Sequence, residues 1–261
     1  MLVLSTRKAV PHMKIGLQLY TLRKVMETEE QMAFTLGRVK EIGYECVQLA
    51  GTLEQMERVG LAAMKAGLPV VSLMATLEEY MRNEEETFRV AKLLGATDLG
   101  ISSAHKTMEE TVELIRQANS FAQRAKAHGL TLSYHNHSNE LIRMADGKTG
   151  LDLLLEGFSS DVCFTPDTYW LQHGGADVRF WLTKLSSRTK ILHLKDMKRT
   201  AEGVTFAEIG EGNLWWDGIL PQAVSAGIEC YVVEQDKCDG DPLESIEISY
   251  RCLCRKLSAF L

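Results

Sequence analysis

The sequence predicts a single α/β domain in which eight parallel strands close into a (β/α)8 barrel. Short apolar runs alternate with longer amphipathic segments along the chain, which is the pattern of buried parallel strands joined by helices. Five helical segments end at a glycine that leads directly into the next strand, as expected where a left-handed residue ends a helix. No glycine-rich turn follows the first strand, which argues against a doubly wound nucleotide-binding sheet.

Eight strands are expected in chain order, because eight short runs are rich in branched or leucine side chains and are bounded by turn residues. They are Lys14–Leu19, Cys46–Ala50, Pro69–Leu73, Asp98–Ser102, Leu130–His135, Val162–Thr165, Lys190–Leu194 and Cys230–Glu234. The clearest helices between them are Glu29–Ile42, Leu53–Ala66, Asn83–Leu94, Met108–His128 and Trp216–Ala226. Gly43, Gly67, Gly95, Gly129 and Gly227 follow these helices.

The bulk properties predict one catalytic barrel over residues 13–261. Single barrels have about this length, and the strand pattern starts only after Met13. We therefore expect residues 1–12 to be a disordered extension or an over-extended start, with too short an apolar run for a secretory signal.

Composition also restricts the partners. The net charge of −6 argues against a nucleic-acid surface, which needs a basic stripe. No stretch approaches the ~20 apolar residues of a membrane span, and six scattered cysteines are typical of free thiols in a reducing compartment. We expect a cytoplasmic protein with a small-molecule substrate and without nucleic-acid or membrane partners; a homo-oligomer is left open.

The most informative feature is a polar residue at the end of each of the last four strands: His135, Asp167, His193 and Glu234. In a (β/α)8 barrel the carboxyl ends of the strands meet at one mouth, where active sites are built. One such residue has ordinary structural explanations, and Asp167 alone would be a helix or turn cap. Four in succession indicate an enzyme site.

Further polar residues accompany this set. Strand alternation places His135 and His137 on the same face, and Glu140 lies in the loop that follows. Lys195 shares a face with His193, although Lys195 and Asp196 could also form a surface pair.

The mixture of carboxylates and imidazoles suits a divalent ion such as Mn²⁺, Co²⁺, Zn²⁺ or Mg²⁺, and the sequence does not choose among them. Such an ion could polarise a carbonyl and stabilise an enediolate while a nearby base moves the neighbouring proton. Trp170 is either a core residue or an apolar platform for a sugar ring.

Six motifs then carry a family resemblance from the first strand to the last. They are Gly16–Arg23 (GLQLYTLR), Tyr134-His135-Asn136-His137-x-x-Glu140, Asp167–Trp170 (DTYW), Arg188-x-x-x-Leu192-His193-Leu194-Lys195-Asp196, Ile209–Gly212 (IGEG) and Val233–Asp236 (VEQD). With them the chain resembles the sugar phosphate isomerase/epimerase family, whose members have the xylose-isomerase-like TIM barrel. The motifs are specific to this fold and metal site, and much less specific to a substrate.

The resemblance implies that Asp167, His193 and Glu234 are metal ligands. The family normally adds a carboxylate from the fifth strand, but His135 stands there in this chain and Glu140 is the nearby carboxylate. Either could be the fourth ligand; we favour His135.

For catalysis we expect His137, Glu140, Glu234 and Lys195. The substrate contacts expected are Tyr20, Gln48, Trp170, Asp196 and Glu211. Gln48 stands where a glutamate often ends the second strand, and Met74 near a position that often holds a histidine, which implies altered substrate contacts.

Three functions follow from these residues. The first is a divalent-metal-dependent isomerase or epimerase that acts on a ketose or keto-sugar through an enediolate. The second is a lyase with the same enolate chemistry, because the ending His135-x-His137 resembles the branch that contains inosose dehydratases; it would dehydrate a keto-polyol or split a keto-glycoside. The third is a catalytically inactive barrel that serves as a binding or partner subunit. A DNA-repair endonuclease of this fold would need more histidines and a basic groove.

Overall fold

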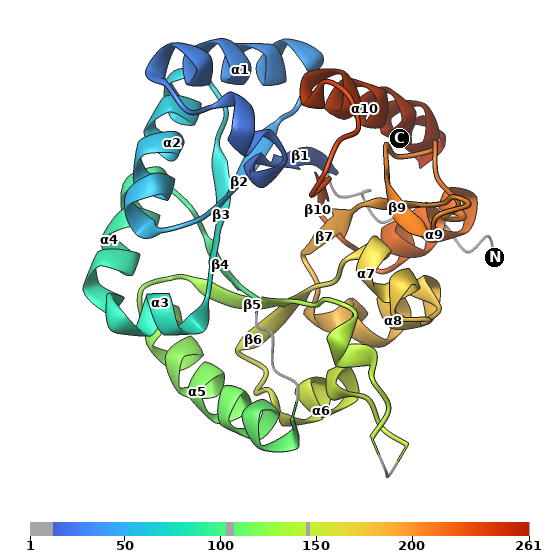
Figure 1. Ribbon diagram of the computed structural model, residues 1–261. Coiled ribbons are helices and arrows are strands. Elements are labelled where there is room, and N and C mark those ends of the chain that lie inside the picture. Colours follow the sequence, from blue (N-terminus) through green and yellow to red (C-terminus); the bar gives the residue numbers. More distant parts are fainter. Residues whose placement is uncertain (1–12, 103–106, 145–146, 261) are drawn as a thin grey trace, which may run out of the picture.

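The computed structural model describes residues 13–102, 107–144 and 147–260. Eight parallel strands form one sheet in the order β6-β5-β4-β3-β2-β1-β10-β7, and the strands surround a centre with the helices outside them (Figure 1). The ends of the sheet meet through single bridges between Phe164 and Thr189 and between Asp167 and His193. The nearly closed barrel confirms the predicted fold class. The expected extension at residues 1–12 lies outside the described residues.

The strands that form the barrel agree with the predicted ranges to within two residues at either end. They are β1 (Lys14–Gln18), β2 (Cys46–Ala50), β3 (Val70–Ala75), β4 (Asp98–Ile101), β5 (Thr131–His135), β6 (Val162–Thr165), β7 (Ile191–Leu194) and β10 (Cys230–Val233). The sequence did not predict an antiparallel hairpin after β7, which consists of β8 (Asp196–Arg199) and β9 (Val204–Ala207).

Helices cover the outside of the barrel (Figure 1). Five correspond to the predicted ones: α1 (Glu29–Ile42), α2 (Leu53–Lys65), α4 (Glu84–Leu94), α5 (Met108–Ala127) and α9 (Trp216–Ser225). The others are α3 (Leu77–Arg82), α6 (Gly150–Gly157), α7 (Thr168–His173), α8 (Val178–Leu185) and α10 (Pro242–Leu257), with short 3-10 helices η1 (Leu19–Val25), η2 (Asn139–Leu141), η3 (Ser186–Arg188) and η4 (Ser258–Phe260). Among the described residues, none of these helices has the length and apolarity needed to cross a bilayer.

The predicted glycine stops are confirmed, since all five glycines have φ between 69° and 118°. This left-handed region is open to glycine at little cost and turns the chain from helix to strand. At the opposite ends of α1, α2 and α5, Thr28, Thr52 and Thr107 form capping boxes with Gln31, Gln55 and Glu110. Such caps satisfy amide groups that would otherwise lack partners.

The main apolar core lies between the strands and the surrounding helices, and it includes Leu17, Leu73, Leu132 and Tyr231. The opposite face of the strands points into the barrel and carries many polar side chains. This is evident from a hydrogen bond between His193 on β7 and Gln48 on β2, because these strands are not neighbours in the sheet. The interior of the barrel thus holds polar side chains that position the site, together with a small apolar cluster of Cys46, Ile191, Cys230 and Val232.

Candidate metal centre

The four predicted ligands come together at the carboxyl ends of the barrel strands. His135 ends β5, His193 lies in β7, and Asp167 and Glu234 follow β6 and β10 directly. Each offers one ligand atom, and these atoms all lie within 4.8 Å of one another. All four side chains are buried. Residues far apart in the sequence thus form one compact cluster of two carboxylates and two imidazoles.

The contacts inside the cluster fit a cation. His193 Nδ1 lies 3.1 Å from Glu234 Oε2 and 3.9 Å from Asp167 Oδ2, and the rings of His135 and His193 are 4.5 Å apart. His135 Nδ1 and Asp167 Oδ2 are buried without a hydrogen-bond partner. Such orphaned atoms are costly unless something binds them. The donor set of oxygen and imidazole nitrogen suits a divalent transition ion.

Asp167 has two roles, which the sequence presented as alternatives. Its Oδ1 accepts a hydrogen bond of 2.9 Å from the amide of Trp170 and so caps α7. Its backbone amide donates to Asn136 Oδ1 at 3.1 Å. The cap holds the carboxylate in one orientation, with Oδ2 directed to the cluster. The structural role therefore positions the ligand atom.

Lys195 is buried among three carboxylates instead of forming a surface pair with Asp196. Its Nζ lies 2.8 Å from Glu234 Oε2, 3.2 Å from Asp167 Oδ2 and 2.7 Å from Asp236 Oδ2. Asp167 Oδ2 and Asp236 Oδ2 nevertheless lack an aligned hydrogen-bond donor. The contacts are therefore ion pairs by distance.

Burial and charge shift the pKa values here in opposite directions. Burial raises the pKa of Asp167 to about 6, against the effect of Lys195 and His193. Burial would also raise the pKa of Glu234, but Lys195 and His193 hold it well below its usual value. Burial opposes the charged form of Lys195, yet the surrounding carboxylates raise its pKa. Glu234 and Lys195 are consequently both charged at neutral pH.

Burial keeps two histidines neutral, one at the end of β5 and one in the loop that follows it. Burial lowers the pKa of His135 well below its usual value and lowers that of His137 as well. Metal binding requires a neutral imidazole, so the environment of His135 favours the form that can act as a ligand.

A cavity of about 920 Å³ lies next to the cluster, and Tyr20, Met74, Ser102, His137 and Trp170 are among its lining residues. The ring of His137 is 5.0 Å from that of His135 and 5.0 Å from that of Trp170. His137 thus belongs to the lining of the cavity and also contacts the ring of His135. A cavity of this size accommodates a small organic ligand.

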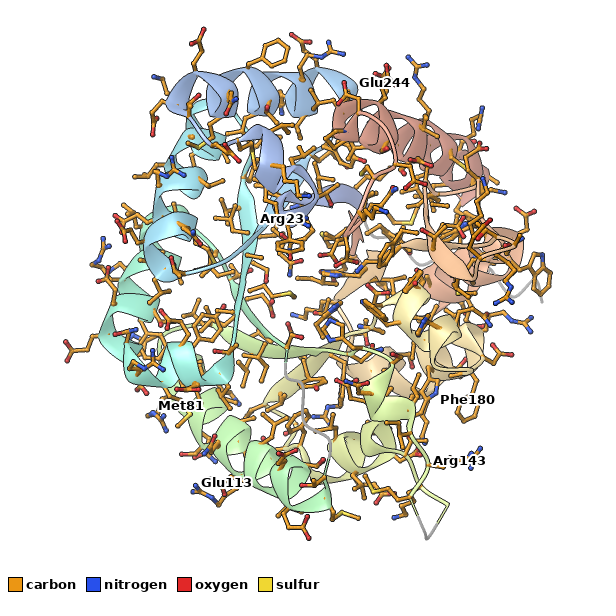
Figure 2. All side chains as sticks on the ribbon, in the orientation of Figure 1. Arg23, Met81, Glu113, Arg143, Phe180 and Glu244 are labelled. Atoms are coloured by element: carbon orange, nitrogen blue, oxygen red, sulfur yellow. The ribbon has the colours of Figure 1, made fainter. Side chains whose placement is uncertain are left out.

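Tyr20 forms part of the rim of this cavity. Its side chain is 40% exposed, and the guanidinium of Arg23 packs on its ring at 3.8 Å. Arg23 also donates to the backbone oxygen of Asp236. Figure 2 shows Arg23 near the middle of the ring of strands, whereas Met81, Glu113 and Phe180 lie on the outside.

Glu140 is not part of the ligand cluster. Its Oε1 accepts a hydrogen bond of 2.6 Å from the Tyr134 hydroxyl, and its Oε2 accepts one of 3.0 Å from the amide of His137. Both oxygens therefore hold the loop after β5. Of the two candidates for the fourth ligand, the structure brings His135 and not Glu140 to the other three.

Three expected substrate contacts have other surroundings. Asp196 is fully buried. Its oxygens accept hydrogen bonds from Trp216 Nε1, from the amide of the next residue and from three amides of the loop after β9. The carboxylate organises that loop, so we no longer propose a substrate contact for it. Gln48 is also fully buried, with both polar atoms bonded to protein groups. Glu211 is exposed and does not line the cavity.

The sequence reasoning assigned no role to Gln18 and Asp236, although both adjoin the centre. Asp236 stands two residues after Glu234, and strand alternation was the signal that could have placed it beside Lys195. Gln18 ends the first strand and bonds to Gln48 on the second. Only the register between these strands, in which Gln18 pairs with Gln48, brings the two amides together.

Comparisons with known proteins agree with this architecture. The sequence profile described as "Xylose isomerase-like TIM barrel" matches residues 36–255. An inosose dehydratase from Mesomycoplasma hyopneumoniae strain J is 24% identical over 188 residues, which cover 63% of this chain and 62% of that protein. The chain thus matches somewhat less than two thirds of the length of this relative.

Two solved structures share the fold. A sugar phosphate isomerase/epimerase from Parabacteroides distasonis superimposes with a TM-score of 0.78 and 24% identity, over 93% of this chain and 98% of that one. The IOLI protein, solved with a zinc atom bound, superimposes with a TM-score of 0.73 and 13% identity, over 95% and 99% of the two chains.

The profile spans most of the chain, and the barrel it describes is the one that the strands form. This protein belongs to the xylose isomerase-like TIM barrel family.

Proposed function

We propose that this protein is a divalent-metal-dependent isomerase or epimerase that acts on a ketose or keto-sugar through an enediolate. The observation that carries the proposal is the buried cluster of His135, Asp167, His193 and Glu234 beside a cavity of sugar size. A bound divalent ion would polarise the substrate carbonyl and stabilise the charge that develops when the neighbouring proton leaves.

Glu234 is the group best placed to accept a proton from the substrate, and Lys195 is best placed to balance the negative charge. Lys195 keeps the Glu234 carboxylate ionised, so this carboxylate can accept a proton from the carbon next to the carbonyl. The ammonium lies 2.8 Å from Glu234 Oε2 and can stabilise negative charge near it. A fixed charge that is already oriented needs no reorganisation during the reaction.

His137 is our candidate for the second proton carrier. It lines the cavity and its lowered pKa keeps the imidazole neutral at pH 7, so one ring nitrogen can accept a proton. Ser102 Oγ lies 3.2 Å from Nδ1, and Glu140 holds the backbone amide of His137. These contacts orient the ring, which is the condition for efficient general acid–base catalysis.

The lining of the cavity suits the hydroxyl groups of a sugar. It includes Thr52, Gln55, Glu79 and Asn139, whose hydroxyl, amide and carboxylate groups can hydrogen-bond to a sugar. Trp170 adds a flat apolar ring whose Nε1 has no hydrogen-bond partner. We therefore propose Trp170 and Tyr20 as substrate contacts.

Dehydration of a keto-polyol is the second candidate, and two observations favour it. The family normally supplies a carboxylate from the fifth strand, but His135 stands there in this chain. The nearby carboxylate, Glu140, is held by Tyr134 and His137 away from the cluster. The match to an inosose dehydratase points the same way. In this reaction the neutral His137 would first take up the proton from the carbon next to the carbonyl and then pass it to the departing hydroxyl group, which leaves as water.

Deuterium incorporation in D₂O separates these functions. The protein would be loaded with Mn²⁺ and incubated with ketoses, keto-inositols and keto-glucosides. A product that carries deuterium at the carbon next to the carbonyl, and otherwise has the same elemental composition as the substrate, supports epimerisation or isomerisation. Loss of water supports dehydration, and loss of the aglycone supports a keto-glycoside lyase. A protein that binds no Mn²⁺ and exchanges no proton would instead be the inactive barrel.

A further inference from the structure

We propose that Gln48 is a positioning residue that fixes the tautomer of His193, so that the lone pair of Nδ1 points to the metal centre. His193 Nε2 lies 2.5 Å from Gln48 Oε1, on the side of the ring opposite the cluster. His193 Nδ1 is the nitrogen that lies 3.1 Å from Glu234 Oε2. The inference rests on the metal centre of the proposed function and not on the reaction itself.

The direction of each hydrogen bond follows from a backbone amide, which can only donate. The amide of Tyr20 donates to Gln18 Oε1 at 3.2 Å, so the other end of the Gln18 amide is its NH₂ group. That group donates to Gln48 Oε1 at 2.9 Å. Gln48 Oε1 must therefore be the acceptor, although amide oxygen and nitrogen are otherwise hard to tell apart.

The other end of Gln48 supports the same orientation. Its Nε2 donates to Ser72 Oγ at 3.0 Å, and Ser72 in turn donates to Asp98 Oδ2 at 2.7 Å. A flipped Gln48 would place its NH₂ group against the NH₂ group of Gln18 and against His193. The network is consistent in one arrangement only.

The consequence for His193 is a defined protonation pattern. Because Gln48 Oε1 accepts, Nε2 must carry a hydrogen. Without a metal, Nδ1 hydrogen-bonds to the Glu234 carboxylate; a metal that displaced the hydrogen on Nδ1 would find its lone pair directed to the centre, in a neutral ring with Nε2–H. Metal-binding histidines commonly donate their other N–H to an outer partner, and loss of such a partner weakens metal binding about 10–100-fold. All of these side chains are buried, so water does not compete for the bonds.

The direct test is Gln48→Met, which keeps the length of the side chain and removes the acceptor. We expect ¹⁵N NMR of the Zn²⁺-loaded protein to show a shift of His193 from the Nε2–H form, with Nδ1 on the metal, towards a mixture with the Nδ1–H form. We expect the dissociation constant for Co²⁺, measured by its absorption spectrum, to rise about 10–100-fold. His193→Gln identifies the His193 signals among those of the seven histidines.

Three further variants separate orientation from simple packing. Gln48→Glu keeps an acceptor and should keep both the Nε2–H form and a Co²⁺ affinity no weaker than that of the wild type. Gln18→Met removes the group that orients Gln48 and should give a smaller shift in the same direction. Ser72→Ala removes the acceptor for Gln48 Nε2 but leaves Gln18, which orients Gln48 Oε1, in place. Tautomer and affinity should therefore change much less than in Gln48→Met.

An unchanged tautomer and a Co²⁺ affinity within twofold of the wild type in Gln48→Met would overturn the proposal. Equal losses in Ser72→Ala and Gln48→Met would overturn it as well, because the effect would then be one of packing. If Gln48→Met does not fold, Gln18→Met carries the test, and an unchanged tautomer there contradicts the inference. None of these measurements needs a substrate, so the outcome is independent of the proposed reaction.

Discussion

The two ends of the barrel both contain buried carboxylates but treat them in opposite ways. At the carboxyl end, Asp167 and Glu234 share Lys195, and Asp167 Oδ2 still lacks an aligned hydrogen-bond donor. At the amino end, Asp98 lies in the lining of a cavity of about 660 Å³, and its Oδ2 accepts hydrogen bonds from Ser72 and Ser133.

The difference shows which carboxylates are available for chemistry. Asp98 has hydrogen-bond donors but no cation at ion-pair distance among the described residues, and burial raises its pKa to about 6. Glu234 has a cation, and its pKa is held low despite burial. A buried charge that is paired and has unused bonding capacity is suited to bind a metal ion, whereas Asp98 is suited to join strands.

Substitutions at the two ends of the barrel should differ most in their effect on the rate of catalysis. We expect Glu234→Gln to lower the rate of deuterium exchange about 10²–10⁴-fold, because it removes a ligand and the proposed base at once. Glu229→Gln, an exposed residue at the amino-end cavity, is the matched control and should exchange at the wild-type rate. Equal rates in both variants would remove Glu234 from the mechanism.

The next effect concerns stability without metal. Lys195→Met leaves buried carboxylates without their cation, and breaking one side of a buried ion pair costs about 3–5 kcal/mol. We expect urea unfolding to show a loss of this size, which becomes smaller when Mn²⁺ is added. Lys190→Met at the exposed amino end should change stability by less than about 0.5 kcal/mol. A Lys195→Met protein as stable as the wild type would contradict the ion-pair account.

The pH dependence of stability should have opposite signs for Asp98 and Glu234, whereas Asp167, whose pKa burial also raises to about 6, should behave like Asp98. The pKa of Asp98 rises from 3.8 to about 6 on folding, so the folded state binds more protons than the unfolded state between these values. Stability due to Asp98 therefore falls as pH rises through this window, by up to roughly 3 kcal/mol in total. Glu234 contributes in the other direction, since its lowered pKa gives stability that is lost as pH falls.

Asp98→Asn tests the amino-end part of this statement. Relative to the wild type, the variant should be most stable above about pH 6 and should lose that advantage as pH falls towards 4. Urea unfolding at several pH values measures the difference in the free energy of unfolding between the variant and the wild type. Proton uptake by the other residues is common to both proteins and cancels in this difference. A difference that does not change with pH would mean that folding does not raise the pKa of Asp98.

The smallest effect distinguishes Glu140 from a ligand. Glu140→Gln weakens the hydrogen bonds that orient His137 and should slow exchange about tenfold, which corresponds to about 1.4 kcal/mol. The affinity for Mn²⁺ should stay within about threefold of the wild type. His135→Ala is the matched comparison and should weaken Mn²⁺ binding. If Glu140→Gln weakened Mn²⁺ binding as strongly, Glu140 and not His135 would be the fourth ligand.

Local patterns were enough to predict the barrel and the positions of its strands. Alternating apolar runs and helical segments set the order of elements, and glycines such as Gly43 and Gly95 marked helix ends because few other residues adopt their backbone angles. The hairpin after β7 was not predicted, because its short strands carry a mixed surface pattern without a buried face.

The sequence by itself determined which residues stand at the ends of the strands, because strand alternation and chain order depend only on neighbouring residues. Only the tertiary structure decided their partners. It brought His135 and not Glu140 to the cluster, buried Lys195 among three carboxylates, and turned Gln48 from an expected substrate contact into a partner of His193. Such choices depend on how the sheet closes, since closure brings together strands that are not neighbours in sequence or in hydrogen bonding.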